Sequence, residues 1–392
     1  MQQWHLDLQQ EIAKNTVATV SYMGSKGTHL TRYLELNQVT PTPSNQNPYK
    51  IGEPIGDGID PSTGSPIHDD CSAPNTTPSG VPVTGQALVN LQIACGANPD
   101  PFRTNFPGVG SVAGLREQAS STYHALEASV RRNVGGLQLS LAYTYSHSID
   151  DSSSARDAII LNSDDLGRAR ASSNFDQRHM FNLGYVYDLP FFRNPGFTHK
   201  VLGGWQWSGI VTLQSGTPFS PGNGVFGDNA GVANGISMNS SQSYPDVIGN
   251  PRSGVSNFAF PGFGPLLYNP SAFAAPRGLT FGDMPRNFLT NPRRTNFDMA
   301  VFKHFAITER MGFEFRAEAF NVFNHIEYAW LGGDGGSAAS NSPFGASNST
   351  LTCYAGANNS AGDPGCTGAN AYLRPAAAHN GRILQLGAKF IF

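Results

Sequence analysis

Apolar and polar side chains alternate along nine separate stretches of the chain. Because successive side chains of a β-strand point to opposite faces, a period of two predicts strands with one apolar and one polar face. The longest uninterrupted register runs from Leu137 to Tyr145. The apolar positions of the nine stretches are Trp4, Leu6 and Leu8; Ala18, Val20 and Tyr22; Leu126, Ala128 and Val130; Leu137, Leu139, Leu141, Tyr143 and Tyr145; Phe181, Leu183, Tyr185 and Tyr187; Trp205, Trp207, Val211 and Leu213; Phe297, Met299 and Val301; Phe313, Phe315, Ala317 and Ala319; and Leu384, Leu386, Ala388, Phe390 and Phe392.

The connections between these stretches alternate in length. Short ones lie near residues 10–15, 133–136, 190–199 and 306–309, and long ones span roughly residues 25–118, 150–173, 216–292 and 326–380. Many stretches run for about 10 to 14 residues, as do the tilted strands of outer-membrane barrels, which have short periplasmic turns and long outer loops. If the last strand ends in the periplasm, counting back places every short turn there. The first strand then begins at the extracellular rim, so we expect a strand before it.

Composition agrees with a β-rich chain that has no membrane-spanning helix. Charged residues make up 14% of the 392 residues, and there are 44 glycines and 27 prolines. No run approaches the roughly 18 to 20 consecutive apolar residues of a transmembrane helix, and the mean hydropathy is −0.28. The net charge of −3 and the scattered basic residues make nucleic acid an unexpected partner. The start, Met1 to Asp7, carries no secretory signal, so we expect an incomplete exported protein.

The four cysteines form two local pairs within loop-like segments. Cys71 and Cys95 lie in one long connection, and Cys353 and Cys366 lie in another. Neither pair has the CxxC spacing of a zinc site, and paired loop cysteines suit an oxidising compartment. We expect two disulfides, the alternative being unpaired thiols.

The polar face of the predicted strands carries charge, which suits a hydrated or plugged lumen rather than a packed barrel interior. Glu314, Arg316 and Glu318 alternate on one strand and are candidates for contact with a plug or a substrate. The alternative is that they pair across strands, at about 0.2–1 kcal/mol each. The charged residues assigned to this face are Glu127, Arg131, Asp176, Arg178, Asp298, Glu314, Arg316, Glu318 and Lys389.

Two loop motifs suggest chemistry that the spacing does not support. His147, Ser148 and Asp150 are the residue types of a hydrolase triad, but neighbours on an extended strand alternate faces and do not converge. The acidic pairs at residues 150–151 and 164–165 offer oxygen ligands for calcium without any known calcium-loop spacing. We therefore expect no catalytic residues, no metal, no cofactor and no enzymatic activity.

Several stretches resemble the C-terminal barrel of Oar-like TonB-dependent transporters, which are outer-membrane receptors. The most specific is the Arg-Ala-Glu-Ala-Phe-Asn-Val-Phe-Asn-His segment, followed by a chain end at Phe392. The terminal alternation through Phe390 and Phe392 also resembles the signal that the outer-membrane assembly machinery recognises. The stretches that carry the resemblance are residues 20–30, 123–126, 143–151, 175–179, 214–219 and 316–325.

The resemblance implies an antiparallel transmembrane β-barrel in the cell outer membrane, with membrane lipid around it. Such transporters have about 22 strands, a plug, a box that contacts TonB, and an N-terminal carboxypeptidase-regulatory-like domain. None of the last three is recognisable, so residues 1–392 are expected to be the C-terminal barrel portion alone, linked to the TonB complex only through absent parts. The expected function is substrate uptake of an unknown ligand. The alternatives are a surface interaction or structural barrel without transport, and a passive pore.

Overall fold

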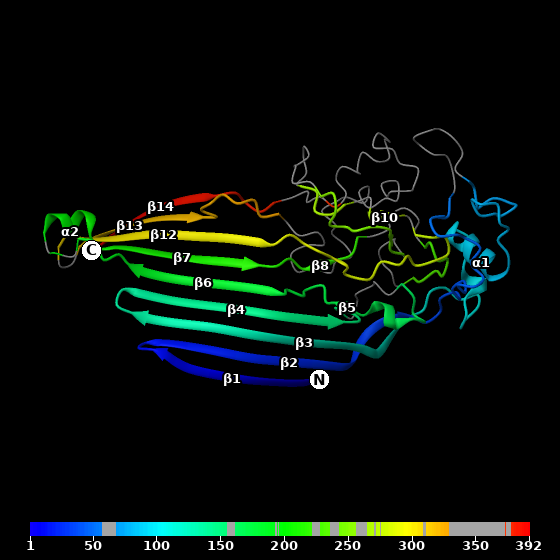
Figure 1. Ribbon diagram of the computed structural model, residues 1–392, viewed down its shortest axis with the longest axis horizontal. Coiled ribbons are helices and arrows are strands. Elements are labelled where there is room, and N and C mark those ends of the chain that lie inside the picture. Colours follow the sequence, from blue (N-terminus) through cyan, green and yellow to red (C-terminus); the bar gives the residue numbers. More distant parts are fainter. Residues whose placement is uncertain are drawn as a thin grey trace.

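One antiparallel sheet dominates the structure, which is a computed structural model (Figure 1). The residues that it describes are 1–56, 68–154, 161–192, 194, 196–221, 228–235, 243–255, 265–269, 272–274, 276–308, 311–328, 373 and 378–392. Nine strands follow one another in chain order across the sheet. They are β1 (Gln2–Ala13), β2 (Thr16–Glu35), β3 (Ala113–Val134), β4 (Leu137–Asp150), β6 (His179–Asp188), β7 (Trp205–Gln214), β12 (Arg294–Ala306), β13 (Gly312–Phe320) and β14 (Ile383–Ile391).

The predicted all-β meander of nine long strands is confirmed. Helices are few: α1 (Gly85–Ala94), α2 (Phe197–Leu202) and the short 3₁₀ segments Asp100–Phe102 and Leu166–Ala169. Within the described ranges, no helix combines the length and the apolar character needed to cross a membrane.

The short connections gather at one end of the sheet and the long ones at the other, so we call these the short-turn end and the long-loop end (Figure 1). β3 and β4 are joined by Gly135 and Gly136, and Gly135 has a φ of 61°. β1 and β2 are joined by Lys14 and Asn15, with a φ of 55° at Asn15. Two-residue hairpins need such positive φ values, which glycine and asparagine adopt most readily.

The first long loop is shorter than its predicted span of residues 25–118. β2 continues to Glu35 and β3 begins at Ala113, so the ladder between them extends far beyond the alternating stretches. The pairing register shifts between Gly27 and Leu30 and again between Leu30 and Thr31. An irregularity of this kind moves the side chains to the other face while the backbone remains paired. The alternation therefore ends before the strand does.

The long connections fold into a cap over the long-loop end, defined here as the described residues of 36–112, 151–178 and 215–293. Its minor strands are β5 (Ala171–Ser172), which pairs with β4, and β8 (Pro218–Phe219), β9 (Asp246–Val247), β10 (Phe273–Ala274) and β11 (Leu289–Thr290). One apolar cluster centres on Phe273 and Met284, and a second on Tyr49 and Leu91. The clustered apolar cores of the described chain thus lie mainly in the cap, not on the sheet.

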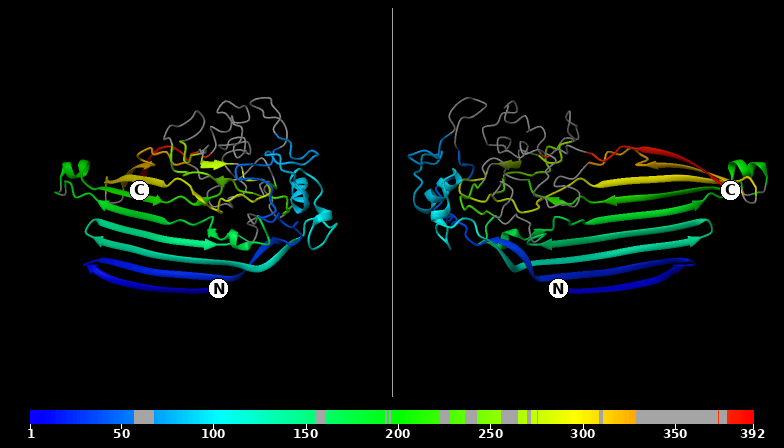
Figure 2. Two further views of the ribbon diagram at one scale, coloured as in Figure 1. Left: turned by 45° about the vertical axis from the view of Figure 1, so that its right-hand side comes forward. Right: turned by 180° about the vertical axis from the view of Figure 1, so that it is seen from behind.

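The two outer strands of the sheet, β1 and β14, each pair on one side only among the described residues. Both run toward the short-turn end, where the C-terminus lies (Figures 1 and 2). Nine antiparallel strands in sequence order must begin and end in the same direction.

Candidate functional site

The apolar positions of the nine strands share one face of the sheet. The register places Leu141 between Val130 and Leu183. Large apolar side chains on this face are widely exposed, with Leu6 at 72% and Leu386 at 74%. So much exposed apolar surface marks an interface, not a face in contact with water. One rung of this face crosses six strands through Leu8, Val20, Ala128, Tyr143, Phe181 and Leu213.

Aromatic side chains gather toward both ends of the apolar face. Toward the long-loop end, a hydrogen bond of 2.9 Å joins the Tyr22 hydroxyl to Nδ1 of His124. The pair recurs between Tyr143 and His179, also at 2.9 Å. Rings with a polar end suit the boundary between hydrocarbon and water, so the two bands are the girdles of a membrane wall. Toward the short-turn end, ring contacts join Tyr185 with Trp207, Trp205 with Phe315, and Phe313 with Phe390.

The opposite face is polar and hollowed. A groove of about 1090 Å³ lies along it, and a second hollow of about 310 Å³ lies on β3, β4 and β6 and on the segment that precedes β6. The predicted charged positions Arg131, Asp298 and Glu318 line the groove, and Glu127 and Asp176 line the second hollow. A polar interior of this width is that of a hydrated or plugged channel.

The candidate contact residues Glu314, Arg316 and Glu318 are adjacent on the groove side of β13. The guanidinium of Arg316 lies 3.5 Å from Glu314 Oε1 and 3.6 Å from Glu318 Oε1. It also stacks over the Phe302 ring at 4.6 Å, and Lys389 is the cross-strand neighbour of Glu314. These contacts are those of a half-exposed network on the wall, each pair contributing about 0.2–1 kcal/mol.

Two ion pairs tie the end of the wall to the cap. Arg286 pairs with Asp150, and both side chains are almost fully buried, at 2% and 3% exposure. Arg32 lies 3.6 Å from Asp151. Asp150 and Asp151, which were considered as calcium ligands, are thus engaged with arginines. No group of three or more His, Cys, Asp or Glu is placed to hold a metal ion within the part of the chain that the structure describes.

The three residues at the end of β4 that are of the types found in a hydrolase triad, His147, Ser148 and Asp150, do not converge. His147 Nδ1 lies 2.9 Å from Asp176 Oδ2, while the Ser148 hydroxyl lies 2.7 Å from that of Ser173. Asp150 is committed to Arg286. Each side chain therefore has a different partner, as the alternation of a strand requires.

The cap contains a carboxyl group that titrates near neutral pH. Burial raises the pKa of Asp228 from 3.8 to about 6, and its Oδ1 is shielded from solvent. The folded cap therefore holds a proton that the unfolded chain releases between pH 4 and 6. We expect the cap to lose up to about 3 kcal/mol of stability as the pH rises through this window. Cap hydrogen exchange at several pH values would measure the loss, and Asp228→Asn should remove it; a variant with the same pH profile would contradict the assignment.

The sequence profile of the outer membrane beta barrel domain family matches residues 1–353. The chain belongs to this family. The apolar face is accordingly the lipid face of an outer-membrane β-barrel, the short turns are periplasmic and the cap is extracellular.

Other comparisons add little about this barrel. No curated protein matches the sequence. Among solved structures, the outer membrane transporter YddB from Escherichia coli matches with a TM-score of 0.35 and 7% sequence identity. The match covers 83% of this chain and 28% of the transporter, so the chain spans under a third of that protein's length.

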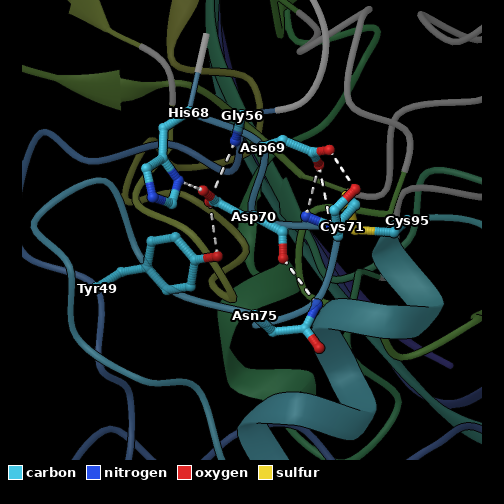
Figure 3. The surroundings of a disulfide bond; sticks show 9 residues. Tyr49, Gly56, His68, Asp69, Asp70, Cys71, Asn75 and Cys95 are labelled. Carbon is cyan, nitrogen blue, oxygen red and sulfur yellow. Dashed lines mark hydrogen bonds and ion pairs between the residues drawn. A yellow bond between two sulfur atoms is a disulfide. The ribbon is translucent and has the colours of Figure 1, made fainter. Parts of the chain in front are cut away.

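One of the two expected disulfides is present in the cap of the barrel: Cys71 and Cys95 are bonded (Figure 3). The bond joins α1 to a loop in which Asp70 accepts hydrogen bonds from the Tyr49 hydroxyl at 2.8 Å and the Gly56 amide at 3.2 Å. Burial raises the pKa values of both Asp70 and Tyr49. This arrangement fixes the loop. Cys353 and Cys366 lie outside the described residues.

The C-terminal strand of the barrel presents the predicted assembly residues. Phe390 packs on Phe313 with ring centroids 5.0 Å apart, and Phe392 is 96% exposed. The sequence did not point to Arg286 or to Lys303, which is buried at the periplasmic end of β12. The signal for Lys303 in the sequence was its position, because it is a basic residue where the alternation of the strand calls for an apolar one.

Proposed function

We propose that this barrel segment is the C-terminal part of a TonB-dependent outer-membrane receptor similar to the Oar-like transporters, and that the whole protein takes up a solute through a gated lumen. The observation that carries the proposal is the groove of about 1090 Å³ on the inner face, where the charged side chains of Arg131, Asp298 and Glu318 lie among apolar ones. A wall that is apolar outside and polar inside serves passage of a hydrophilic solute. The cap covers the extracellular end, where capture would take place.

The direction of the two outer strands supports a larger barrel. A second copy of this chain, rotated about the membrane normal, would place its β1 parallel to β14. Bacterial outer-membrane barrels are antiparallel throughout, so closing the wall requires an odd number of further strands from another segment. The plug and the TonB contact would likewise belong to other parts of the protein.

We further propose that the protein is not an enzyme, since the triad types of the β4 end have separate partners. A surface interaction or structural barrel is the second candidate, and the cap favours it. The cap has its own apolar clusters, a disulfide and buried ion pairs, which would give a stable surface for a partner.

Two measurements on the complete protein separate these functions. The first is KCl conductance in planar bilayers, and the second is photo-crosslinking to TonB in cells. A closed barrel that crosslinks to TonB would support the transporter. Steady conductance without crosslinking would mean a passive pore, and a closed barrel without crosslinking would favour the interaction protein.

Deleting Phe392 is expected to reduce assembly into the outer membrane without changing synthesis, because we propose that the assembly machinery binds the last strand. Heat-modifiable migration of membrane fractions on gels measures assembly. Phe392→Tyr, which keeps an aromatic ring at the last position, is the matched control, and equal assembly of both variants would refute a terminal signal.

A further inference from the structure

The periplasmic connection between β6 and β7 carries an apolar patch, which we call the turn patch. The segment includes α2 and ends with Gly203 and Gly204 before β7 begins. Its apolar side chains are exposed, and Phe197 is the most exposed of them at 81%. A group of exposed apolar side chains that lie together marks an interaction surface. The turn patch consists of Phe191, Phe192, Phe197, Val201 and Leu202, with exposures of 58%, 54%, 81%, 42% and 49%.

The turn patch is held on the lipid side of the wall by Lys303. This residue belongs to the lipid face, because the register places it between Trp205 and Phe315. Its ammonium donates to the carbonyl oxygens of Val201 at 2.7 Å and Gly203 at 2.5 Å. The same group lies 5.4 Å from the ring centre of Trp205. Lys303 is 2% exposed, so the turn covers a cation on the lipid face and is bound to that face.

The turn itself is held in a compact shape by contacts within it. His199 Nδ1 lies 2.6 Å from the Phe192 carbonyl oxygen, which ties the helix to the segment before it. A Cβ at Gly203 would come within 2.7 Å of the same oxygen, so only glycine allows this approach. Lys200 is exposed on the same short helix. An apolar patch with a basic group beside it is typical of a segment at the boundary between headgroups and acyl chains.

We propose that the turn patch is an interfacial anchor that inserts into the periplasmic leaflet of the outer membrane, with Lys303 as the residue that positions it. The patch continues the lipid face at its lower girdle, near Trp205 and Phe315. Its occupant is phospholipid at the headgroup boundary, with Lys200 at the level of the phosphates. The anchor fixes the depth of the wall in the membrane.

The test uses nitroxide labels on the assembled protein in vesicles of phosphatidylethanolamine and phosphatidylglycerol. Cys353 and Cys366 are replaced by serine so that the label attaches only at Phe197→Cys. Collision rates with oxygen and with a water-soluble nickel chelate give the depth of the label. Leu386→Cys on the lipid face and Lys14→Cys in the exposed turn between β1 and β2 are the matched controls. We expect position 197 to prefer oxygen, as position 386 does.

A preference for nickel like that of position 14 would overturn the proposal and assign the turn patch to a periplasmic protein. The role of Lys303 is tested with Lys303→Met in the Phe197→Cys background. The label should become more mobile in its spectrum while heat-modifiable migration stays unchanged. An unchanged spectrum would show that Lys303 does not position the turn. Neither readout depends on transport, so the proposed function can fail while the anchor holds.

Discussion

Replacing Leu141 with arginine is expected to destabilise the barrel by about 2–4 kcal/mol, the cost of a charged side chain near the middle of the bilayer. Leu141 lies on the lipid face between Val130 and Leu183, and between the two aromatic girdles. Unfolding titrations of the complete barrel in phospholipid vesicles would give the free energy difference.

The neighbouring position provides the control for this register. Ala142 points to the polar face, where its cross-strand neighbours are Ser129 and Asn182. Arginine at Ala142 should therefore change the free energy of unfolding little, because its charge reaches the hydrated lumen. Equal destabilisation by the two variants would mean that the two faces have been assigned wrongly.

Replacing Arg286 with methionine is expected to destabilise the cap by about 3–5 kcal/mol, because it leaves the Asp150 carboxylate buried without its cation. Arg286 also donates to the Ala169 carbonyl oxygen at 2.9 Å. Loss of hydrogen-exchange protection at the β4 end and in the segment around Ala169 would measure the effect.

A double variant distinguishes a missing partner from lost packing. In Asp150→Leu with Arg286→Met both charges are gone, and apolar contacts replace the pair. Replacing a buried ion pair with apolar residues is often neutral, so we expect most of the protection to return. If the double variant is as unstable as Arg286→Met, packing and not the unpaired charge accounts for the loss.

The wall of the barrel could be predicted from the sequence because its rule is local. Alternation along residues such as Leu137 to Tyr145 determines the face on which each side chain lies. The alternation of short and long connections indicates the end of the sheet at which each connection lies. Prediction from alternation failed at Gly27 to Thr31, where the pairing register shifts. The alternation ends there, so the sequence did not indicate that β2 and β3 continue beyond it.

The cap could not be predicted in the same way, because its contacts join residues that are far apart in the sequence. Arg286 meets Asp150 across 136 positions, and Asn90 donates to the Gly231 carbonyl oxygen across 141. No periodicity records such pairs. The Cys71–Cys95 bond was accessible because its partners lie only 24 positions apart. The sequence shows Lys303 as a basic residue at an apolar position of its strand, but not its partners, because these are backbone carbonyl oxygens.

The ladder formed by β2 and β3 extends beyond the bilayer on the extracellular side. These strands have 20 and 22 residues, whereas about 9–11 residues suffice to cross the bilayer. Roughly ten residues of each, or about 30 Å of ribbon, thus stand above the membrane. This ribbon holds the disulfide-bonded loop at a distance from the membrane surface. The disulfide-bonded loop is therefore part of the extracellular surface that an antibody can bind.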